Sequence, residues 1–147
     1  MIDIVKASAG SGKTFLSSNI ATVLSIKRRK VLVIDGDMRH ASLSEYVDSP
    51  KKGLSNYLAG DFENYRDLVH QVGDNTYLHI LPVGTIPPNP SELIGNARFR
   101  ELVANAKKEY DYVFIDCPPI DIVADTQIIS DIADRTVFVT RAGVLEK

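Results

Sequence analysis

The sequence predicts an α/β domain with a doubly wound, mostly parallel sheet that carries helices on both faces. Four short, nearly continuous apolar runs rich in β-branched residues have the pattern of strands buried on both sides, at residues 2–5, 31–34, 113–115 and 137–139. The segments between them repeat apolar residues at the spacing of one helix face. Strand and helix patterns alternate along the chain, an order that predicts right-handed crossovers between parallel strands.

The first helix is expected after the first strand, because four apolar residues recur there at helical spacing: Leu16, Ile20, Val23 and Leu24. The basic run at 27–30 is placed at the end of this helix, where cations meet the helix dipole favourably. A fifth candidate strand follows from the alternation of Leu78, Ile80 and Pro82.

A second helix is predicted near residue 91, with an apolar face formed by Leu93, Ala97, Leu102 and Ala106. Asn89 can cap this helix, Pro90 fits its first position, and Glu92 completes a capping box. The preceding segment TIPPNP is too rich in proline to continue a strand, and we expect a rigid turn there.

Length and composition predict a single domain that covers residues 1–147 and buries an ordinary core, since 44% of the residues are hydrophobic. The net charge of −2 gives no basic footprint, so we expect no nucleic-acid partner. The single cysteine, Cys117, suits a reducing, cytoplasmic setting, and no apolar run approaches the roughly 20 residues of a membrane span. Doubly wound domains usually continue with another helix and strand, so we expect the domain to be short at its C-terminal end.

The run ASAGSGKT at residues 7–14 predicts a phosphate-binding loop, and with it the P-loop NTPase fold. Small residues let consecutive backbone N–H groups curl around an anion, and the following helix adds its dipole. Gly10 and Gly12 allow close approach, Lys13 can reach the β- and γ-phosphates, and the Thr14 hydroxyl can bind Mg²⁺. Ala7 departs from the strict motif, which has glycine at this position. The plain alternative is a glycine-rich turn with a solvent-facing lysine.

Three acidic residues end two of the predicted strands: Asp35 and Asp37 in VLVIDGD, and Asp116 in DYVFIDCPP. Ligands of open α/β sheets bind beyond these strand ends, on the rim where the phosphate loop must lie. Carboxylates gathered there would repel one another, and a bound Mg²⁺ would relieve the repulsion by bridging them to phosphates. The alternative is that one or two of these acids only cap the following turns or helices.

With these motifs the chain resembles the cytoplasmic kinase domain of bacterial tyrosine kinases, the Walker-motif enzymes of capsule and exopolysaccharide synthesis. The resemblance runs almost end to end. It rests on SGKTFLSSNIA, VLVIDGDMRH, GLSNYLAG, LPVGTIPPNPSELIGNARFRELV, YDYVFIDCPP and TVFVTRAG. The PPNPSEL run carries most weight, because P-loop proteins in general have no physical need for it.

The resemblance implies an ATP- and Mg²⁺-dependent protein-tyrosine kinase that autophosphorylates and regulates polysaccharide export. The implied catalytic residues are Asp35, as acceptor of the proton from the attacking hydroxyl, with Asp37 and Lys13. The implied metal site is formed by Thr14, Asp35 and Asp116. The implied nucleotide-binding residues are Ala9, Gly10, Ser11, Gly12, Lys13, Thr14, Phe15 and Arg141. Arg141 and Arg39 are each equally compatible with an ordinary surface arginine.

The resemblance also implies partners: a protein tyrosine acceptor, a membrane adaptor or fused transmembrane segment, and a homo-oligomeric ring at the inner face of the plasma membrane. Cys117 stands where the family usually has threonine, and Ala41 where proline is common. The family's tyrosine-rich tail and the helix before its first strand are absent from this sequence. The six tyrosines present are interpreted as core and surface residues rather than acceptor sites.

Two other functions stay open at this point. The partitioning and division-site ATPases share the second Walker motif, but they carry an extra lysine at the position of Ser8. Such an ATPase would act as a nucleotide-controlled switch. The other function is that of a degraded nucleotide-binding module that acts only as an interaction surface. The presence of the key site residues argues against it: Lys13, Thr14, Asp35 and Asp116.

Overall fold

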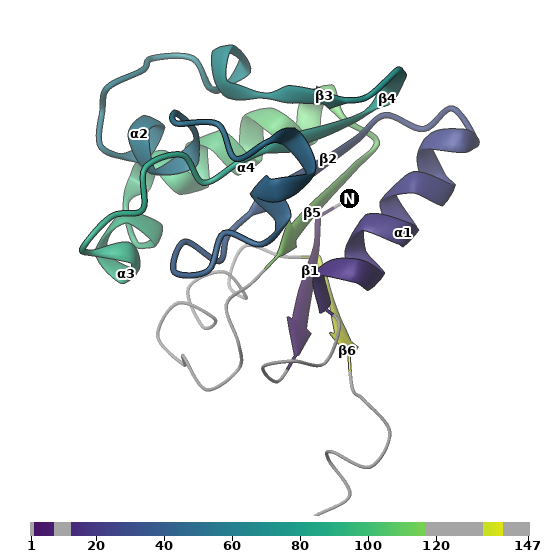
Figure 1. Cartoon of the computed structure of the whole chain (residues 1–147), viewed down its shortest axis with the longest axis horizontal. Coiled ribbons are helices and arrows are strands. Elements are labelled where there is room, and N and C mark those ends of the chain that lie inside the picture. Colours follow the sequence, from purple (N-terminus) through teal and green to yellow (C-terminus); the bar gives the residue numbers. More distant parts are fainter. Residues whose placement is uncertain (1, 8–12, 117–133, 140–147) are drawn as a thin grey trace, which may run out of the picture.

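Six strands form one sheet in the part of the chain that the computed structural model describes, residues 2–7, 13–116 and 134–139. Their order is β3-β4-β2-β5-β1-β6 (Figure 1). The strands are β1 (Ile2–Ala7), β2 (Val31–Asp35), β3 (His70–Val72), β4 (Asn75–Leu81), β5 (Tyr112–Asp116) and β6 (Arg135–Val139). All neighbours pair in parallel except β3, which runs antiparallel to β4 at one edge. The predicted mostly parallel sheet is confirmed.

Helices cover both faces of this sheet, as a doubly wound fold requires (Figure 1). Helix α1 (Lys13–Ile26) lies on one face. Helix α4 (Ala97–Glu109) packs on the other face, beside the short helices α2 (Leu54–Leu58) and α3 (Pro90–Ile94). Two 3₁₀ helices, η1 (Leu43–Val47) and η2 (Tyr65–Leu68), complete the described elements.

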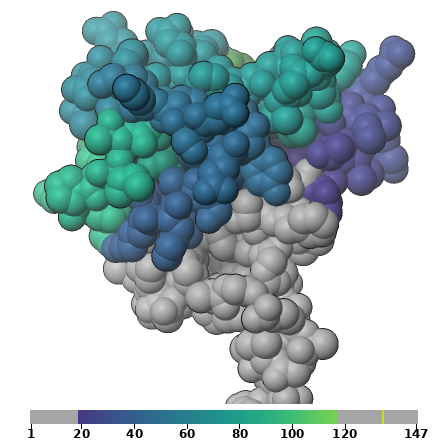
Figure 2. All heavy atoms as spheres, in the orientation of Figure 1, coloured from purple at the N-terminus to yellow at the C-terminus, as the bar shows by residue number. Residues whose placement is uncertain are grey.

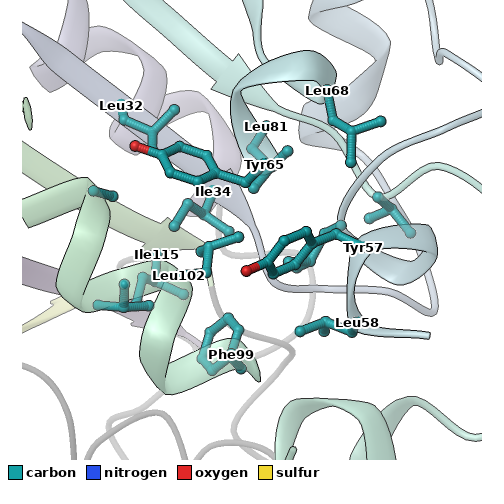
Figure 3. Close-up of a cluster of buried hydrophobic side chains, with 14 of the residues drawn as sticks. Leu32, Ile34, Tyr57, Leu58, Tyr65, Leu68, Leu81, Phe99, Leu102 and Ile115 are labelled. Atoms are coloured by element: carbon teal, nitrogen blue, oxygen red, sulfur yellow. The ribbon is translucent and has the colours of Figure 1, made fainter. Parts of the chain in front are cut away.

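The two cores follow from the alternation of side chains along buried strands. On β2, Val31 and Val33 face the α1 side, where they join Ala21. Leu32 and Ile34 face the α4 side and meet side chains from β4, β5, α2, η2 and α4. Figure 3 shows this larger cluster, in which Phe99 and Leu102 of α4 point toward the strands. Because both faces are covered, the central strands β2 and β5 are apolar in nearly every position before their terminal aspartates, as the sequence pattern predicted.

The structure differs from the sequence-based prediction in the helix near residue 91 and in an additional edge strand. The helix predicted through residues 93–106 is two helices, since α3 ends at Ile94 and α4 begins after Asn96, whose side chain caps the Arg98 amide at 2.9 Å. Pro90 does begin α3, but Asn89 makes no side-chain cap bond to the backbone and instead donates to Glu92 Oε2 at 3.0 Å. Strand β3 was not predicted.

The loop that leaves β4 is fixed by the segment that opens α2. The amides of Leu54 and Ser55 donate to the carbonyls of Pro82 and Val83, at 2.7 and 2.9 Å. The Asn56 side chain accepts from the Gly53 amide and donates to the Thr85 hydroxyl. These bonds join the GLSNY and LPVGT motifs, and we refer to residues 53–56 and 82–85 together as the loop pair. Since β4 pairs in parallel with β2, the loop pair lies next to the exit of β2.

Candidate active site

The carboxyl ends of β2 and β5 bring two of the predicted acids together. Asp35 and Asp116 are register partners on these adjacent parallel strands. Both are buried, with side chains 0% and 1% exposed. The chain stays paired just beyond the strands, because the Gly36 amide donates to the Asp116 carbonyl at 2.9 Å. The prediction that these carboxylates share one rim of the sheet is therefore supported by the strand register.

The Asp35 carboxylate is held mainly by one residue, Ser44 of η1. Its Oδ2 accepts hydrogen bonds from the Ser44 amide at 2.9 Å and from the Ser44 hydroxyl at 2.7 Å. Its Oδ1 accepts one longer bond, from the Asp37 amide at 3.3 Å. One carboxylate oxygen is thus well supplied with donors, and the other has capacity left for a further ligand or proton.

Burial raises the pKa of the Asp35 carboxyl from 3.8 to about 7, because the charged form loses its hydration in the closed rim. The value of about 7 already includes the raising effect of the nearby Asp116 and Asp37 and the lowering effect of the hydrogen bonds from Ser44. A concentration of buried negative charge of this kind is relieved by a proton or by a cation. Oxygen donors in this arrangement are the type that Mg²⁺ prefers.

Asp37 also acts as a turn cap, which was the alternative considered for it. Its Oδ1 accepts from the His40 amide at 3.4 Å, and its carboxylate lies 3.2 Å from His40 Nδ1. Its side chain is mostly buried. Figure 2 shows the segment after β2, in blue, at the surface between α1 in purple and the α3–α4 region in green. Arg39 lies in this exposed segment and donates to Ser91 Oγ at 3.3 Å.

The strand–loop–helix context of the phosphate loop is confirmed at its two ends. Strand β1 ends at Ala7 and α1 begins at Lys13. Since β1 is parallel to its neighbour β5, the loop leaves the sheet at the rim that carries Asp116. The predicted loop residues Ala9, Gly10, Ser11 and Gly12 lie outside the described residues, as do Arg141 and the side chains of Lys13, Thr14 and Phe15.

The acids do not form a ready-made metal cage. Across the described ranges, no group of three or more histidine, cysteine, aspartate or glutamate side chains could hold a metal ion. The predicted metal site needs Thr14 and the phosphates of a nucleotide as well as Asp35 and Asp116, so it stays a prediction.

Two parts of the site were not predicted from the sequence. Ser44 lies nine residues after Asp35 in a short 3₁₀ helix and has no motif of its own. The loop pair was recognised only as two separate motifs of a family, with no indication that they bond to each other.

The basic run at 27–30 also differs slightly from its prediction, because it follows α1 instead of forming its last turn. No described helix has the length and hydrophobicity that a bilayer span requires.

Comparison with known proteins agrees with this arrangement. Residues 1–142 match the family described as the AAA domain. The chain is 45% identical over 139 residues to a putative tyrosine-protein kinase, AmsA of Erwinia amylovora, covering 94% of this chain and 19% of AmsA. The kinase domain of the Escherichia coli tyrosine kinase Etk superposes with a TM-score of 0.91 at 34% identity, over 97% of this chain and 56% of that one.

The septum site-determining protein MinD of Pyrococcus horikoshii, solved with Mg-ADP, superposes less closely. Its TM-score is 0.75 at 28% identity, over 95% of this chain and 58% of that one. The chain thus spans between about a fifth and three fifths of the proteins compared with it. From the domain match over nearly the whole chain and the closer likeness to Etk, the chain belongs to the AAA domain family and is a nucleotide-binding P-loop domain of the bacterial tyrosine kinase type.

Proposed function

We propose that this chain is the catalytic core of an ATP-dependent protein-tyrosine kinase. The observation that carries the proposal is the buried Asp35–Asp116 pair, set on adjacent parallel strands at the rim from which the phosphate loop leaves β1. The likeness to proteins named tyrosine kinases favours a tyrosine hydroxyl over water as the group that attacks the γ-phosphate. This choice is an analogy of site as well as of fold.

The roles of the residues follow from what phosphoryl transfer needs, which is positioning and neutralisation of charge. Lys13 and the amides of Ala9, Gly10, Ser11 and Gly12 would hold the phosphates, with Phe15 and Arg141 against the rest of the nucleotide. Thr14, Asp35 and Asp116 would hold Mg²⁺, which neutralises charge on the phosphates when bound.

Asp35 is the proposed acceptor of the tyrosine proton. Its Oδ1 has hydrogen-bonding capacity left, and a carboxyl with a pKa of about 7 is matched to proton transfer near neutral pH. Asp37, two residues along, would support it through the metal shell while it caps its own turn.

The wider role is also part of the proposal. By its resemblance to the capsule and exopolysaccharide kinases, the whole protein would autophosphorylate and regulate polysaccharide synthesis and export. It would work at the inner face of the bacterial plasma membrane, with a membrane adaptor or a fused transmembrane segment, and assemble as a homo-oligomeric ring. Its protein substrate would present a tyrosine.

The second candidate is a P-loop ATPase switch of the partitioning and division-site class. The likeness to MinD favours it, although the superposition is weaker than that with the Etk kinase domain. The same site would then activate water in place of a tyrosine hydroxyl. The two functions differ in their product, so one assay separates them.

The deciding experiment mixes the intact protein with Mg·ATP and a tyrosine-rich acceptor peptide, and records phosphotyrosine and free phosphate separately. A kinase forms phosphotyrosine, and both Lys13→Ala and Asp35→Asn abolish it. Lys27→Ala, which changes an exposed lysine beyond the end of α1, is the matched control and retains full activity.

Free phosphate without phosphotyrosine, lost in Lys13→Ala, would replace the kinase by the switch. Tight nucleotide binding with neither product would leave only a binding module. Equal activity of Asp35→Asn and the unaltered protein would remove Asp35 from the chemistry, whichever product is formed.

A further inference from the structure

The two oxygens of the Asp35 carboxylate have unequal surroundings. Oδ2 accepts two hydrogen bonds from Ser44, at 2.7 and 2.9 Å, whereas among the described residues Oδ1 accepts only the 3.3 Å bond from the Asp37 amide. Rotation of the carboxylate about its Cβ–Cγ bond would break both Ser44 bonds. Ser44 therefore fixes the orientation of the carboxylate plane, with one oxygen bound and the other available at the rim.

Ser44 is itself held in place from a third element. The Val83 amide donates to Ser44 Oγ at 2.9 Å, and the Ser44 side chain is buried. Because a lone pair of the hydroxyl oxygen is occupied by Val83, the hydroxyl hydrogen is directed at Asp35. Val83 belongs to the loop pair and is fixed in turn by the Ser55 amide, which donates to its carbonyl at 2.9 Å.

We propose that Ser44 is a positioning residue for phosphoryl transfer, which aims Asp35 Oδ1 at the reacting groups by binding Oδ2. The inference rests on the proposed function of Asp35, since it concerns the orientation of that carboxylate. It extends the site to a residue on η1, whose hydroxyl oxygen is held by the Val83 amide. The end of strand β2 thus supplies the acid, and the segment that follows it supplies the group that orients it.

The test is a set of variants of the intact protein, assayed for kcat and for the KM of ATP. Ser44→Ala lowers kcat about 10- to 100-fold, the range expected for losing a hydrogen bond to a charged group that acts in the transition state. The KM of ATP changes less than about threefold, because Ser44 does not contact nucleotide in this scheme. Ser44→Thr restores most of the rate, since it returns the hydroxyl.

Two control variants separate orientation from general destabilisation. Ser55→Ala removes the hydroxyl that donates to the Thr85 carbonyl but keeps the Ser55 amide that binds the Val83 carbonyl, so it lowers stability without removing a bond to Ser44, Val83 or Asp35. Ser42→Ala changes an exposed serine that makes no side-chain cap bond at the start of η1. Both keep the unaltered kcat. A rate loss in Ser55→Ala equal to that in Ser44→Ala, or an unchanged rate in Ser44→Ala, overturns the proposal.

The outcome is distinguishable from a failure of the kinase proposal. If the unaltered protein releases phosphate but forms no phosphotyrosine, the kinase proposal fails and the same variants are compared by phosphate release. If it turns over no ATP, ADP binding is measured by calorimetry with and without Mg²⁺. Ser44→Ala then reduces only the gain in ADP affinity that Mg²⁺ produces. An equal gain in the unaltered protein and in Ser44→Ala overturns the role of Ser44.

Discussion

At the scale of single residues, the buried charge of Asp35, the proposed acceptor of the tyrosine proton, lowers the stability of the folded protein at neutral pH. A fully buried carboxyl next to Asp116 and Asp37 keeps its proton in the folded state up to a pH near 7, whereas the unfolded chain releases it near 3.8. The folded state therefore binds more protons than the unfolded state between these two values. By linkage, the contribution of this group to stability is full below pH 4 and is lost as the pH rises toward 7.

This sign gives the first prediction. Without nucleotide or Mg²⁺, Asp35→Asn is more stable than the unaltered protein at pH 8, by up to about 4 kcal/mol at 1.36 kcal/mol per pKa unit. The difference shrinks as the pH falls to 4. Urea unfolding in EDTA at several pH values measures it. Asp61→Asn, which alters an exposed carboxylate, is the control, and a pH-independent difference between Asp35→Asn and the unaltered protein would contradict the assignment.

A second residue-scale prediction concerns Tyr65 of η2. Its hydroxyl donates to Glu109 Oε2 at 2.5 Å, and Glu109 also pairs with Arg66. The tyrosine side chain is almost fully buried in the α4-side core (Figure 3). Tyr65→Phe keeps the ring but leaves the carboxylate with one donor fewer, so we expect a loss of about 1–2 kcal/mol. Thermal unfolding against Tyr46→Phe, an exposed tyrosine, measures it, and equal unfolding temperatures would refute it.

At the scale of elements, the loop pair depends on two glycine backbones that approach each other closely. Gly84 has φ +80°, and a Cβ there would overlap the Gly53 amide nitrogen and the Asn56 side chain. A Cβ on Gly53 would in turn overlap the Pro82 carbonyl. The GLSNY and LPVGT motifs therefore need glycine at both positions for steric reasons, quite apart from any catalytic role.

The third prediction follows from this contact. Gly84→Ala combines a left-handed backbone with steric overlap and costs at least about 3 kcal/mol, measured by urea unfolding. Gly73→Ala is the matched control, because its φ is +54° but no atom lies within 4 Å of the added Cβ. It costs only about 1 kcal/mol for the backbone conformation. Similar losses in the two variants would show that the close approach is not a determinant of stability.

The sequence was sufficient for the elements that bury apolar residues in a regular pattern. The strands β2 and β5 and the helix α1 could be predicted because each satisfies its periodicity locally. Strand β3 could not, because HQV is short, partly polar and an edge strand, stabilised by pairing with β4 across a turn at Gly73. The break between α3 and α4 was also missed, since the apolar spacing continues across Asn96 while its side chain starts a new helix.

The same distinction applies to the site. The proximity of Asp35 and Asp116 could be predicted, because both end parallel strands and such ends meet at one rim. The role of Ser44 could not, because it depends on how a nine-residue connection folds back over β2 and on a hydrogen bond from Val83 of the loop pair. Contacts of this kind are determined by tertiary packing and leave no periodic pattern in the sequence.

At the scale of the whole molecule, the residues that stabilise the fold and the residues of the candidate site occupy different parts of the sheet. Apolar side chains on its two faces form the cores, and the acids gather where β2 and β5 end. Nucleotide bound at that rim would add a connection between β1, β2, β5 and α1, which already contact one another. Ligand binding should therefore stabilise the entire domain, and the size of this effect depends on Asp35.

The last prediction tests this coupling through thermal unfolding with and without Mg·ATP at pH 8. At about 100 times the Kd, binding adds about 2.7 kcal/mol to the unaltered protein, or about 5–10 °C for a domain of this size. Lys13→Ala starts from the same unfolding temperature and gains little. Asp35→Asn starts higher, because its buried charge is gone, yet we expect it to gain less, because the proposed metal ligand is gone. A full ligand-induced shift in Asp35→Asn would mean that the carboxylate does not take part in binding Mg·ATP.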